Sequence, residues 1–286
     1  MQANEFLNEV LQTAEHPQDF AQIYEQFRFY QRKAIETLQE FHRVCEKNGI
    51  PYQLAYGSLL GAIRDHGQIP WDYDVDVMVP YEQKDALIQA LKEDLNGDYY
   101  FYCPDVDPKC RHYMMRLAPK GFRTEALHVD VFYVIGAPED AQQTESFCRE
   151  LYQLFNQKYD KKVNIKEEAR GRVKRLVKLL LRRLQVIGIS EKEMDARMDE
   201  LCRMYPLEKA ERCVSVDTDC KKRTFPTKVL WETQLYKTDV GEFRITKHYD
   251  RILTDIYGDY NKIYPVKSRI DEMMSCLAMI QYYEKH

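Results

Sequence analysis

The chain has 286 residues, of which 44% are hydrophobic and 31% are charged, so burying a core presents no difficulty. Its net charge of −4 argues against a nucleic-acid-binding protein, and no apolar run approaches the roughly 18 residues of a membrane span. The first residues lack a basic segment followed by an apolar one, so we expect no signal peptide and a cytoplasmic location.

The first half of the chain alternates predicted helices with predicted strands. Apolar residues recur at three- and four-residue spacing over residues 20–48, which predicts an amphipathic helix that ends before Gly49 and Pro51. Strands are predicted over 52–56, 74–79, 99–102, 112–117 and 128–134, and further helices over 59–65 and 81–95. This order indicates an α/β protein of the α+β type.

The second half of the chain favours helices. They are predicted over 141–187, 190–204, 247–257 and 266–283. Ser190 with Glu193 three residues later forms a capping box. We therefore expect three parts: N-terminal helices over residues 1–50, an α/β catalytic core over 51–137 and a helical elaboration over 138–286.

Two carboxylates stand two residues apart on the predicted strand 74–79. Side chains at this spacing point to the same face of a strand, so Asp74 and Asp76 project together while Val75 and Val77 point into the core. Neighbouring carboxylates repel each other unless a cation lies between them. Oxygen ligands of this kind suit Mg²⁺, with Mn²⁺ as a substitute, whereas a solvated acidic turn is the alternative.

A third carboxylate, Asp130, lies on the predicted strand 128–134 between apolar residues. Two metal ions held by three carboxylates stabilise both the attacking and the leaving oxygen of a phosphoryl displacement. We therefore predict that Asp74, Asp76 and Asp130 are the catalytic and metal-binding residues. A structural role for Asp130 at a strand end is the alternative.

Phosphate-binding residues are predicted just before this acidic strand. Gly57 and Ser58 fall between a predicted strand and a predicted helix, where a glycine admits a phosphate and helix N–H groups can bind it. Arg64 follows at the end of the same helix, and we expect these three residues to bind the donor phosphates or nucleotide. The alternatives are an ordinary helix cap for the pair and a surface charge for the arginine.

Three further residues lie between the helix and the acidic strand. We expect substrate contacts from His66, Trp71 and Asp72, with a loop histidine and a packed tryptophan as the alternatives. Eight cysteines occur in the chain. Cys103 and Cys110, with His112 nearby, have the residue types of a metal site, but ordinary reduced thiols are the favoured interpretation.

Taken together, these residues resemble the LicD family, whose relatives include fukutin. The shared pattern runs from residue 30 to residue 265 and comprises Gly57-Ser58, Leu60-Gly61, Arg64, Gly67, Ile69-Pro70-Trp71-Asp72, Asp74, Asp76, His128-Val-Asp130-Val-Phe132, Tyr249-Asp250, Leu253, Tyr257-Gly258-Asp259-Tyr260 and Pro265. The chain departs from the family where Tyr73 replaces an acid and where Asp65 precedes His66.

The resemblance implies a nucleotidyltransferase-like core with a mixed sheet flanked by helices. It also implies a Mg²⁺-dependent transferase that moves a phospho-alcohol, with phosphocholine as the first choice, from a CDP-linked donor to a hydroxyl of a cell-surface glycan and releases CMP. Lipopolysaccharide and teichoic acid precursors are the expected acceptors, in free or lipid-linked form. Asp259 and Tyr260 would close the site, or would simply end a helix at Gly258.

Two other functions remain open. A nucleotidyltransferase acting on a nucleoside triphosphate and a small hydroxyl compound would use the same metal site. A catalytically inactive glycan-binding protein is disfavoured, because an idle acidic cluster destabilises the fold.

The predicted helical region contains a strongly basic segment. Residues 161–183 carry a net charge of +8, which leaves −12 for the rest of the chain. Within residues 166–187, leucines and valines alternate with these basic residues. Such a helix either lies on an anionic membrane surface, at the inner face of the membrane, or packs its leucines on the core.

Overall fold

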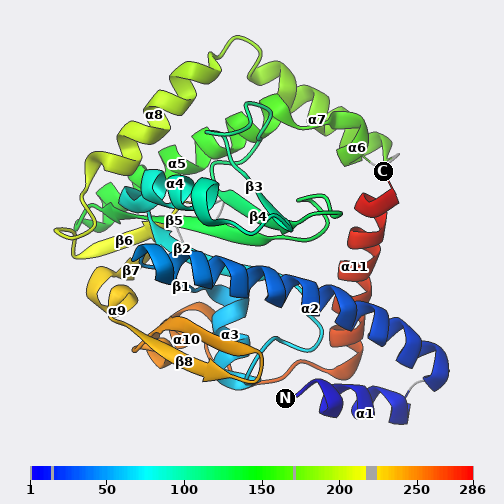
Figure 1. The fold of residues 1–286 in the computed structure, drawn as a ribbon. Helices are drawn as coiled ribbons and strands as arrows, with labels where there is room; N and C mark the ends of the chain where they lie inside the picture. The colour runs from blue at the N-terminus through cyan, green and yellow to red at the C-terminus, as the bar shows by residue number, and fades with distance from the viewer. Residues whose placement is uncertain (1, 14–15, 170–171, 217–223, 286) are drawn as a thin grey trace.

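The computed structural model describes residues 2–13, 16–169, 172–216 and 224–285, and its centre is a mixed sheet (Figure 1). Five strands run in the order β1-β2-β5-β4-β3, and β6 pairs with both β5 and β7. β2 and β5 are parallel and the other pairs are antiparallel. The strands are β1 Gln53–Leu54, β2 Val75–Pro80, β3 Tyr99–Tyr102, β4 Met115–Pro119, β5 Val129–Ala137, β6 Arg212–Ser215 and β7 Thr224–Pro226. The predicted mixed sheet is therefore confirmed.

The N-terminal half supplies helices close to those predicted from the sequence. They are α1 Ala3–Thr13, α2 Pro17–Asn48, α3 Tyr56–Arg64 and α4 Lys84–Asp94, with the 3₁₀ turn η1 Tyr81–Gln83 before α4. The long helix α2 ends at Gly49, whose φ of 63° is left-handed and therefore suits a glycine. α3 begins at Tyr56, so Gly57 and Ser58 lie in its first turn rather than before it.

The C-terminal half is richer in strands than the sequence predicted. Its helices are α5 Ala141–Lys162, α6 Ile165–Ala169, α7 Val173–Gln185, α8 Glu191–Met204, α9 Thr227–Trp231, α10 Tyr249–Tyr257 and α11 Val266–Lys285. Besides β6 and β7, it contains the hairpin of β8 Thr233–Thr238 and β9 Gly241–Thr246. The elaboration expected over residues 138–286 is thus helical only in part, because β6 and β7, with four and three residues, are too short to give a clear alternation.

The helix predicted over residues 141–187 is divided into α5, α6 and α7. The chain leaves α5 at Val163, which has an extended conformation with ψ of 135°. The predicted cap of α8 is confirmed, since the Ser190 hydroxyl accepts a hydrogen bond from the Glu193 N–H. In the described residues, no helix combines the length and the apolar character that a membrane crossing requires.

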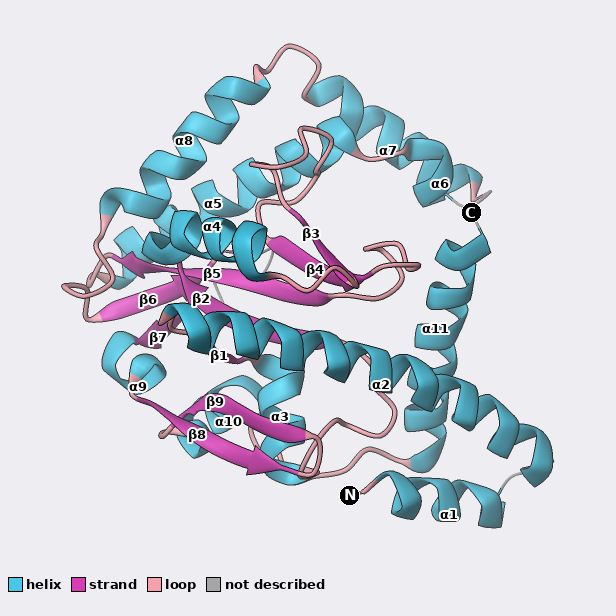
Figure 2. Ribbon diagram, viewed as in Figure 1, coloured by secondary structure: helices cyan, strands magenta, loops and turns pink. Residues whose placement is uncertain are grey.

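The strand register separates a buried apolar face from an acidic one. β2 and β5 pair so that Val75 lies opposite Val129 and Asp76 lies opposite Asp130. The valine face is fully buried, and α2 packs along β2, β4 and β5. The hairpin β8–β9 and α10 lie beside α3, and α11 runs along the edge of the molecule (Figure 2). The register therefore gathers the acidic side chains on the face away from the valines.

One glycine fixes the loop between α3 and β2. The loop folds back over α3, and the Gly67 N–H donates to the Gly61 carbonyl oxygen. A Cβ atom at Gly61 would lie 2.7 Å from the Gly67 carbonyl oxygen and 2.9 Å from the Ile69 nitrogen. Only a glycine admits so close a backbone approach.

We expect Gly61→Ala to lower the free energy of unfolding by about 2 kcal/mol, because the clash outweighs the better helix propensity of alanine. Chemical denaturation measures this change. The control is Gly97→Ala, since a Cβ at Gly97 meets nothing within 4 Å. Equal denaturation midpoints for Gly61→Ala and the wild type would show that the loop does not rest on this contact.

Candidate active site

Three charged side chains form a row across neighbouring strands. Asp76 on β2 is the register partner of Asp130 on β5, and Arg116 on β4 is the register partner of Asp130 on the other side. Paired residues of adjacent strands project from the same face. The structure therefore places Asp76 and Asp130 side by side and adds an arginine that the sequence did not reveal.

The first turn of α3 is anchored to the acidic strand. The Ser58 hydroxyl oxygen accepts a hydrogen bond of 2.8 Å from the Asp76 N–H, and the Ala55 N–H donates to the Asp76 carbonyl oxygen at 3.0 Å. A Cβ at Gly57 would lie 3.4 Å from Oδ2 of Asp72. Gly57 and Ser58 thus place the start of the helix directly against the acidic segment.

Asp72 and Asp74 form an acidic pair ahead of β2. The Asp74 N–H donates to Oδ1 of Asp72 at 3.1 Å. Burial raises the pKa of Asp72. The Asp74 side chain reaches solvent, but the surrounding protein atoms and the charges of Asp72 and Asp130 raise its pKa to about 7. The pair therefore carries more negative charge than its protein surroundings neutralise.

Asp130 has the opposite electrostatic environment. Its Oδ1 lies 2.8 Å from Nε of Arg116, and its Oδ2 lies 3.3 Å from Nε2 of His128. Burial opposes ionisation of Asp130, but Arg116 and His128 outweigh it and hold the pKa of this carboxyl well below its usual range. Asp130 is therefore a fixed carboxylate whose charge is largely balanced by Arg116.

Arg64 lies at the far end of α3 and is already held by protein groups. Its Nη2 contacts Oδ2 of Asp65 at 2.7 Å, and its guanidinium lies 5.6 Å from the centre of the Trp71 ring. Trp71 is 2% exposed and also packs against Phe6 at a centroid distance of 5.4 Å. The structure thus places Trp71 in the core, which favours the packing interpretation over a substrate contact.

The remaining predicted residues lie around this cluster. The His66 side chain is exposed, and its carbonyl oxygen accepts from the Asp239 N–H at the β8–β9 turn. The Tyr260 carbonyl oxygen is 3.4 Å from Nη1 of Arg64. The Tyr260 hydroxyl donates a hydrogen bond of 2.7 Å to the Asp250 carboxylate. Tyr260 thus borders Arg64, whereas Asp259 is exposed beside it.

Gly258 ends α10, as one interpretation of residues 257–260 expected. Its φ of 70° is positive, but its ψ of −121° lies outside the left-handed helical region that a glycine cap usually adopts. Tyr73, which replaces an acid of the family pattern, is 1% exposed and therefore a core residue.

The last helix contributes residues that the sequence did not indicate. Burial and the Asp72 charge raise the pKa of Glu272, while Arg64 lowers it, so Glu272 lies near both side chains. Burial, Asp72 and Asp74 likewise raise the pKa of the Cys276 thiol. No motif connects α11 to the acidic strand, about 200 residues earlier in the chain.

The residues present fit a divalent cation in one respect and not in another. The raised pKa of Asp74 shows an uncompensated cluster of negative charge, which a hard cation would neutralise. However, no group of three or more His, Cys, Asp or Glu side chains in the described ranges is arranged to hold a metal ion. Asp74 and Asp76 are therefore the candidate ligands, and Asp130 is engaged by Arg116.

The two cysteines considered above as metal ligands behave as buried thiols. Cys103 and Cys110 are each 1% exposed, and the Cys110 thiol donates to the His112 carbonyl oxygen at 3.5 Å. Burial raises the pKa of the Cys103 thiol to about 11 and also raises that of Cys110. Protonated thiols fit the interpretation as ordinary reduced cysteines.

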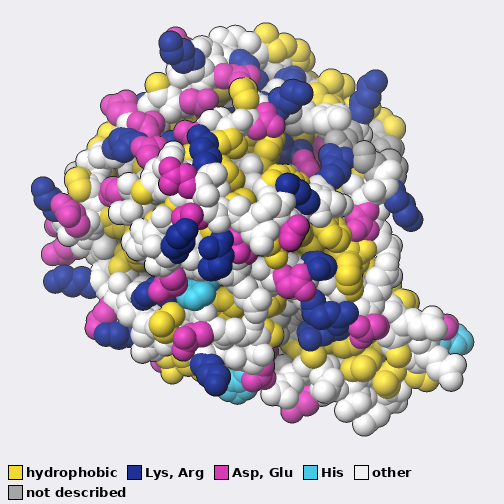
Figure 3. Space-filling model, in the orientation of Figure 1, with side chains coloured by type: hydrophobic (Ala, Val, Ile, Leu, Met, Phe, Trp, Pro, Cys, Tyr) yellow, Lys and Arg dark blue, Asp and Glu magenta, His cyan; other side chains and the backbone are white. Residues whose placement is uncertain are grey.

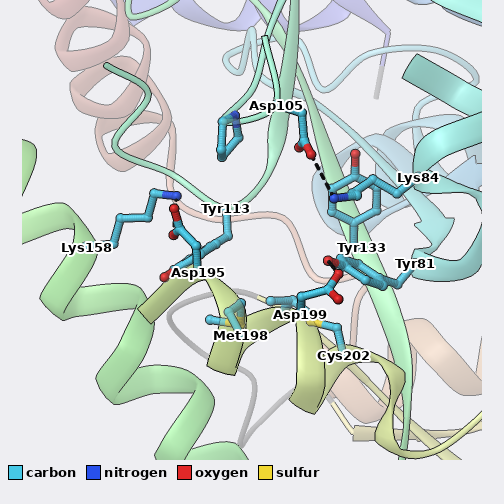
Figure 4. A pocket seen from close by; sticks show the side chains of 12 residues that line it. Tyr81, Lys84, Asp105, Tyr113, Tyr133, Lys158, Asp195, Met198, Asp199 and Cys202 are labelled. Atoms are coloured by element: carbon cyan, nitrogen blue, oxygen red, sulfur yellow. Dashed lines mark hydrogen bonds and ion pairs between the residues drawn. The ribbon is translucent and has the colours of Figure 1, made fainter. Parts of the chain in front are cut away.

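A cavity of about 300 Å³ lies at the other end of the same strands (Figure 4). It is lined by Tyr81, which follows β2, and by Tyr133 in the second half of β5. Lys158 in this cavity lies 2.7 Å from Asp195. None of the predicted catalytic residues lines it, because Tyr133 and Asp130 are three positions apart and point to opposite faces.

A mixed sheet with carboxylates on its parallel pair and a helix start beside them defines a nucleotidyltransferase-type core. Residues 49–140 match the model of the LicD/FKTN/FKRP nucleotidyltransferase domain. Residues 49–140 are therefore similar to the LicD/FKTN/FKRP nucleotidyltransferase domain, and the chain is an enzyme of the transferase class.

Two kinds of relative support this assignment. The chain is 24% identical over 254 residues to the lipopolysaccharide cholinephosphotransferase LicD of Haemophilus influenzae, which covers 83% of this chain and 92% of that protein. It is also 34% identical over 70 residues to the uncharacterized protein RP689 of Rickettsia prowazekii, 23% of this chain and 26% of that protein. The long match extends well beyond the matched domain.

We expect Arg116→Ala to lower the free energy of unfolding by about 3 kcal/mol or more, because it leaves the Asp130 carboxylate buried without its partner. Chemical denaturation near neutral pH tests this. Adding Asp130→Asn to Arg116→Ala should recover part of the loss, since no buried charge then remains. The control Arg149→Ala removes an arginine that is 65% exposed and should cost less than about 1 kcal/mol. If Arg116→Ala lowered the free energy of unfolding as little as Arg149→Ala does, Arg116 would not be compensating the Asp130 carboxylate.

We expect Asp74→Asn to flatten the pH dependence of stability in protein freed of divalent cations. The pKa of Asp74 rises from 3.8 to about 7 on folding, so the native state holds this proton more tightly and its contribution to stability is lost as the pH rises through that window. At alkaline pH, Asp74→Asn should raise the free energy of unfolding by only on the order of 1 kcal/mol, because water screens the exposed carboxylate of the wild type. Denaturation midpoints across the window measure it, and parallel curves for variant and wild type would refute it.

Proposed function

We propose that this chain transfers a phospho-alcohol, with phosphocholine as the first choice, from a CDP-linked donor to a hydroxyl of a cell-surface glycan and releases CMP. A lipopolysaccharide or teichoic acid precursor would be the acceptor, and the reaction would take place in the cytoplasm. The long similarity to a lipopolysaccharide cholinephosphotransferase supports the transferred group and the acceptor. The observation that carries the proposal is the convergence of Asp74, Asp76 and Asp130 beside the start of α3.

In this proposal the donor diphosphate lies between the acidic strand and α3. The free N–H groups of a first helical turn bind phosphate oxygens, and Gly57 leaves room for them. Arg64, at the other end of α3, adds positive charge near Tyr260. Because Asp65 already holds Arg64, a phosphate would share this guanidinium with Asp65.

Mg²⁺ or Mn²⁺, held by Asp74 and Asp76, would neutralise the charge that develops on the phosphates and leaving group. Asp130 stays ionised because Arg116 and His128 hold its pKa low, so it suits charge stabilisation better than proton transfer. Arg116 fixes the position of that carboxylate across the β4–β5 pair. Glu272 and Cys276 of α11 close the same region near Asp72.

CMP release tests the proposal directly. We expect the purified protein with CDP-choline, Mg²⁺ and a membrane-glycan extract to release CMP, and Asp74→Asn or Asp76→Asn to reduce kcat by at least about a hundredfold, because each removes a charge next to the reacting phosphate. Asp98→Asn, at an exposed position on another loop, is the matched control.

The donor and the cleaved bond decide between the alternatives. CMP from CDP-ribitol or CDP-glycerol alone would keep the mechanism and change the alcohol. Pyrophosphate from a nucleoside triphosphate, with no CMP from any CDP-linked donor, would replace this proposal by nucleotidyl transfer.

A further inference from the structure

The helix α7 presents an apolar face to solvent. The large apolar side chains of this face are between 47% exposed at Leu180 and 72% exposed at Val173. The exposed members of this face are Val173, Val177, Leu180, Leu181 and Leu184, and Ile187 follows at 65%. Hydrophobic side chains gather along the upper right edge of the molecule, over α7 (Figure 3). A contiguous apolar face of this kind marks a binding surface.

The exposed residues form one stripe of the helix. Successive residues are about 100° apart around a helix, so positions spaced by three, four, seven, eight and eleven share a side. Counted from Val173, the exposed positions 177, 180, 181 and 184 fall at these spacings. We name these five residues the α7 apolar stripe.

The opposite side of α7 is attached to the protein. Leu179 is 6% exposed, and Nε of Arg182 lies 2.9 Å from Oδ2 of Asp160 on α5. Arg175 pairs with Glu168 on α6, and Arg183 donates to the Val163 carbonyl oxygen. The arginines thus fix the helix to its neighbours, and the α7 apolar stripe faces away from them.

Exposed cations border the α7 apolar stripe. Lys174 and Lys178 are both exposed and lie one turn apart on one flank of the stripe. Arg172, at the N-cap position, is exposed as well. Position 170, a further arginine of the basic segment, lies outside the described residues. Apolar side chains flanked by lysines match a bilayer surface, where anionic headgroups lie over an apolar interior.

We propose that α7 docks onto a bilayer that contains anionic phospholipids, with the α7 apolar stripe inserted at the headgroup level and Lys174 and Lys178 contacting the headgroups. Leucine and valine side chains gain by leaving water, and the lysines gain from the negative surface potential. A second copy of this chain fits less well, because an antiparallel twofold interface on this stripe would bring the lysine flanks of both copies to the same side. The helix lies on the surface rather than across it, since it has 13 residues and five basic side chains.

The attached side of α7 leads back to the candidate active site. Glu168, the partner of Arg175, raises the pKa of Tyr159 together with burial, and the Tyr159 ring lies 5.8 Å from the His112 ring. Burial and the Arg116 charge in turn lower the pKa of His112. A docked α7 would therefore hold the residues around Asp130 close to the membrane, and this consequence rests on the proposed function. The docking itself does not.

Vesicle binding by the full chain tests the docking. We expect co-sedimentation with vesicles of phosphatidylglycerol and phosphatidylcholine, weaker binding to phosphatidylcholine alone, and loss of affinity at high salt. Leu181→Ser with Leu184→Ser should weaken binding by about tenfold or more. Lys174→Gln and Lys178→Gln should each weaken it by about fivefold.

Matched controls keep the test specific. Leu235→Ser changes a leucine that is 44% exposed on β8, and Lys267→Gln changes a lysine that is 85% exposed on α11. Both should bind vesicles like the wild type, and unchanged denaturation midpoints show that all variants are folded. Equal binding by the α7 variants and the controls would overturn the proposal. So would a dimer in light scattering that becomes a monomer in Leu181→Ser/Leu184→Ser while vesicle binding is unchanged.

Because the assay needs no donor or acceptor, its failure leaves the proposed transfer reaction untouched, and failed CMP release leaves the docking untouched.

Discussion

The parallel pairing of β2 with β5 is the constraint on which the site depends. It sets Asp76 opposite Asp130, and two neighbouring carboxylates on adjacent strands are unfavourable by themselves. The fold offsets one of them with Arg116, which the antiparallel β4 delivers to the same row. The negative charge of Asp74 is less well compensated by the protein, and the pKa of Asp74 is raised as a result. The site thus combines a fixed, neutralised carboxylate with an acidic pair that still attracts positive charge.

The elements around this row are arranged to present it. The Ser58 hydroxyl oxygen accepts a hydrogen bond from the Asp76 N–H, which ties the start of α3 to β2. Gly61 lets the following loop cross α3 closely and return the chain to β2. α11 then brings Glu272 and Cys276 to the same region from the C-terminal end of the chain. Parts of the chain far apart in sequence therefore build one site.

The sequence predicted the acidic cluster because the information is local. Alternation on two strands shows which face each aspartate occupies, and the parallel pair then brings those faces together. Arg116 could not be predicted, since its role follows from the β4–β5 register and not from any motif. The same holds for Glu272 on α11. The strands β6 and β7 escaped prediction because they are short, so tertiary contacts decide their pairing, whereas β9 does alternate buried Phe243 and Ile245 with Glu242 and Arg244. The spacing of apolar residues over 141–187 also did not reveal the breaks between α5, α6 and α7.

Divalent-cation binding by Asp74 and Asp76 is tested by titrating Mn²⁺ into metal-free protein and following it by electron paramagnetic resonance. We expect saturable binding to the wild type that Mg²⁺ competes away and that Asp74→Asn/Asp76→Asn abolishes. Binding of Mn²⁺ to that double variant as tightly as to the wild type, or no binding to the wild type even with CDP-choline present, would contradict it.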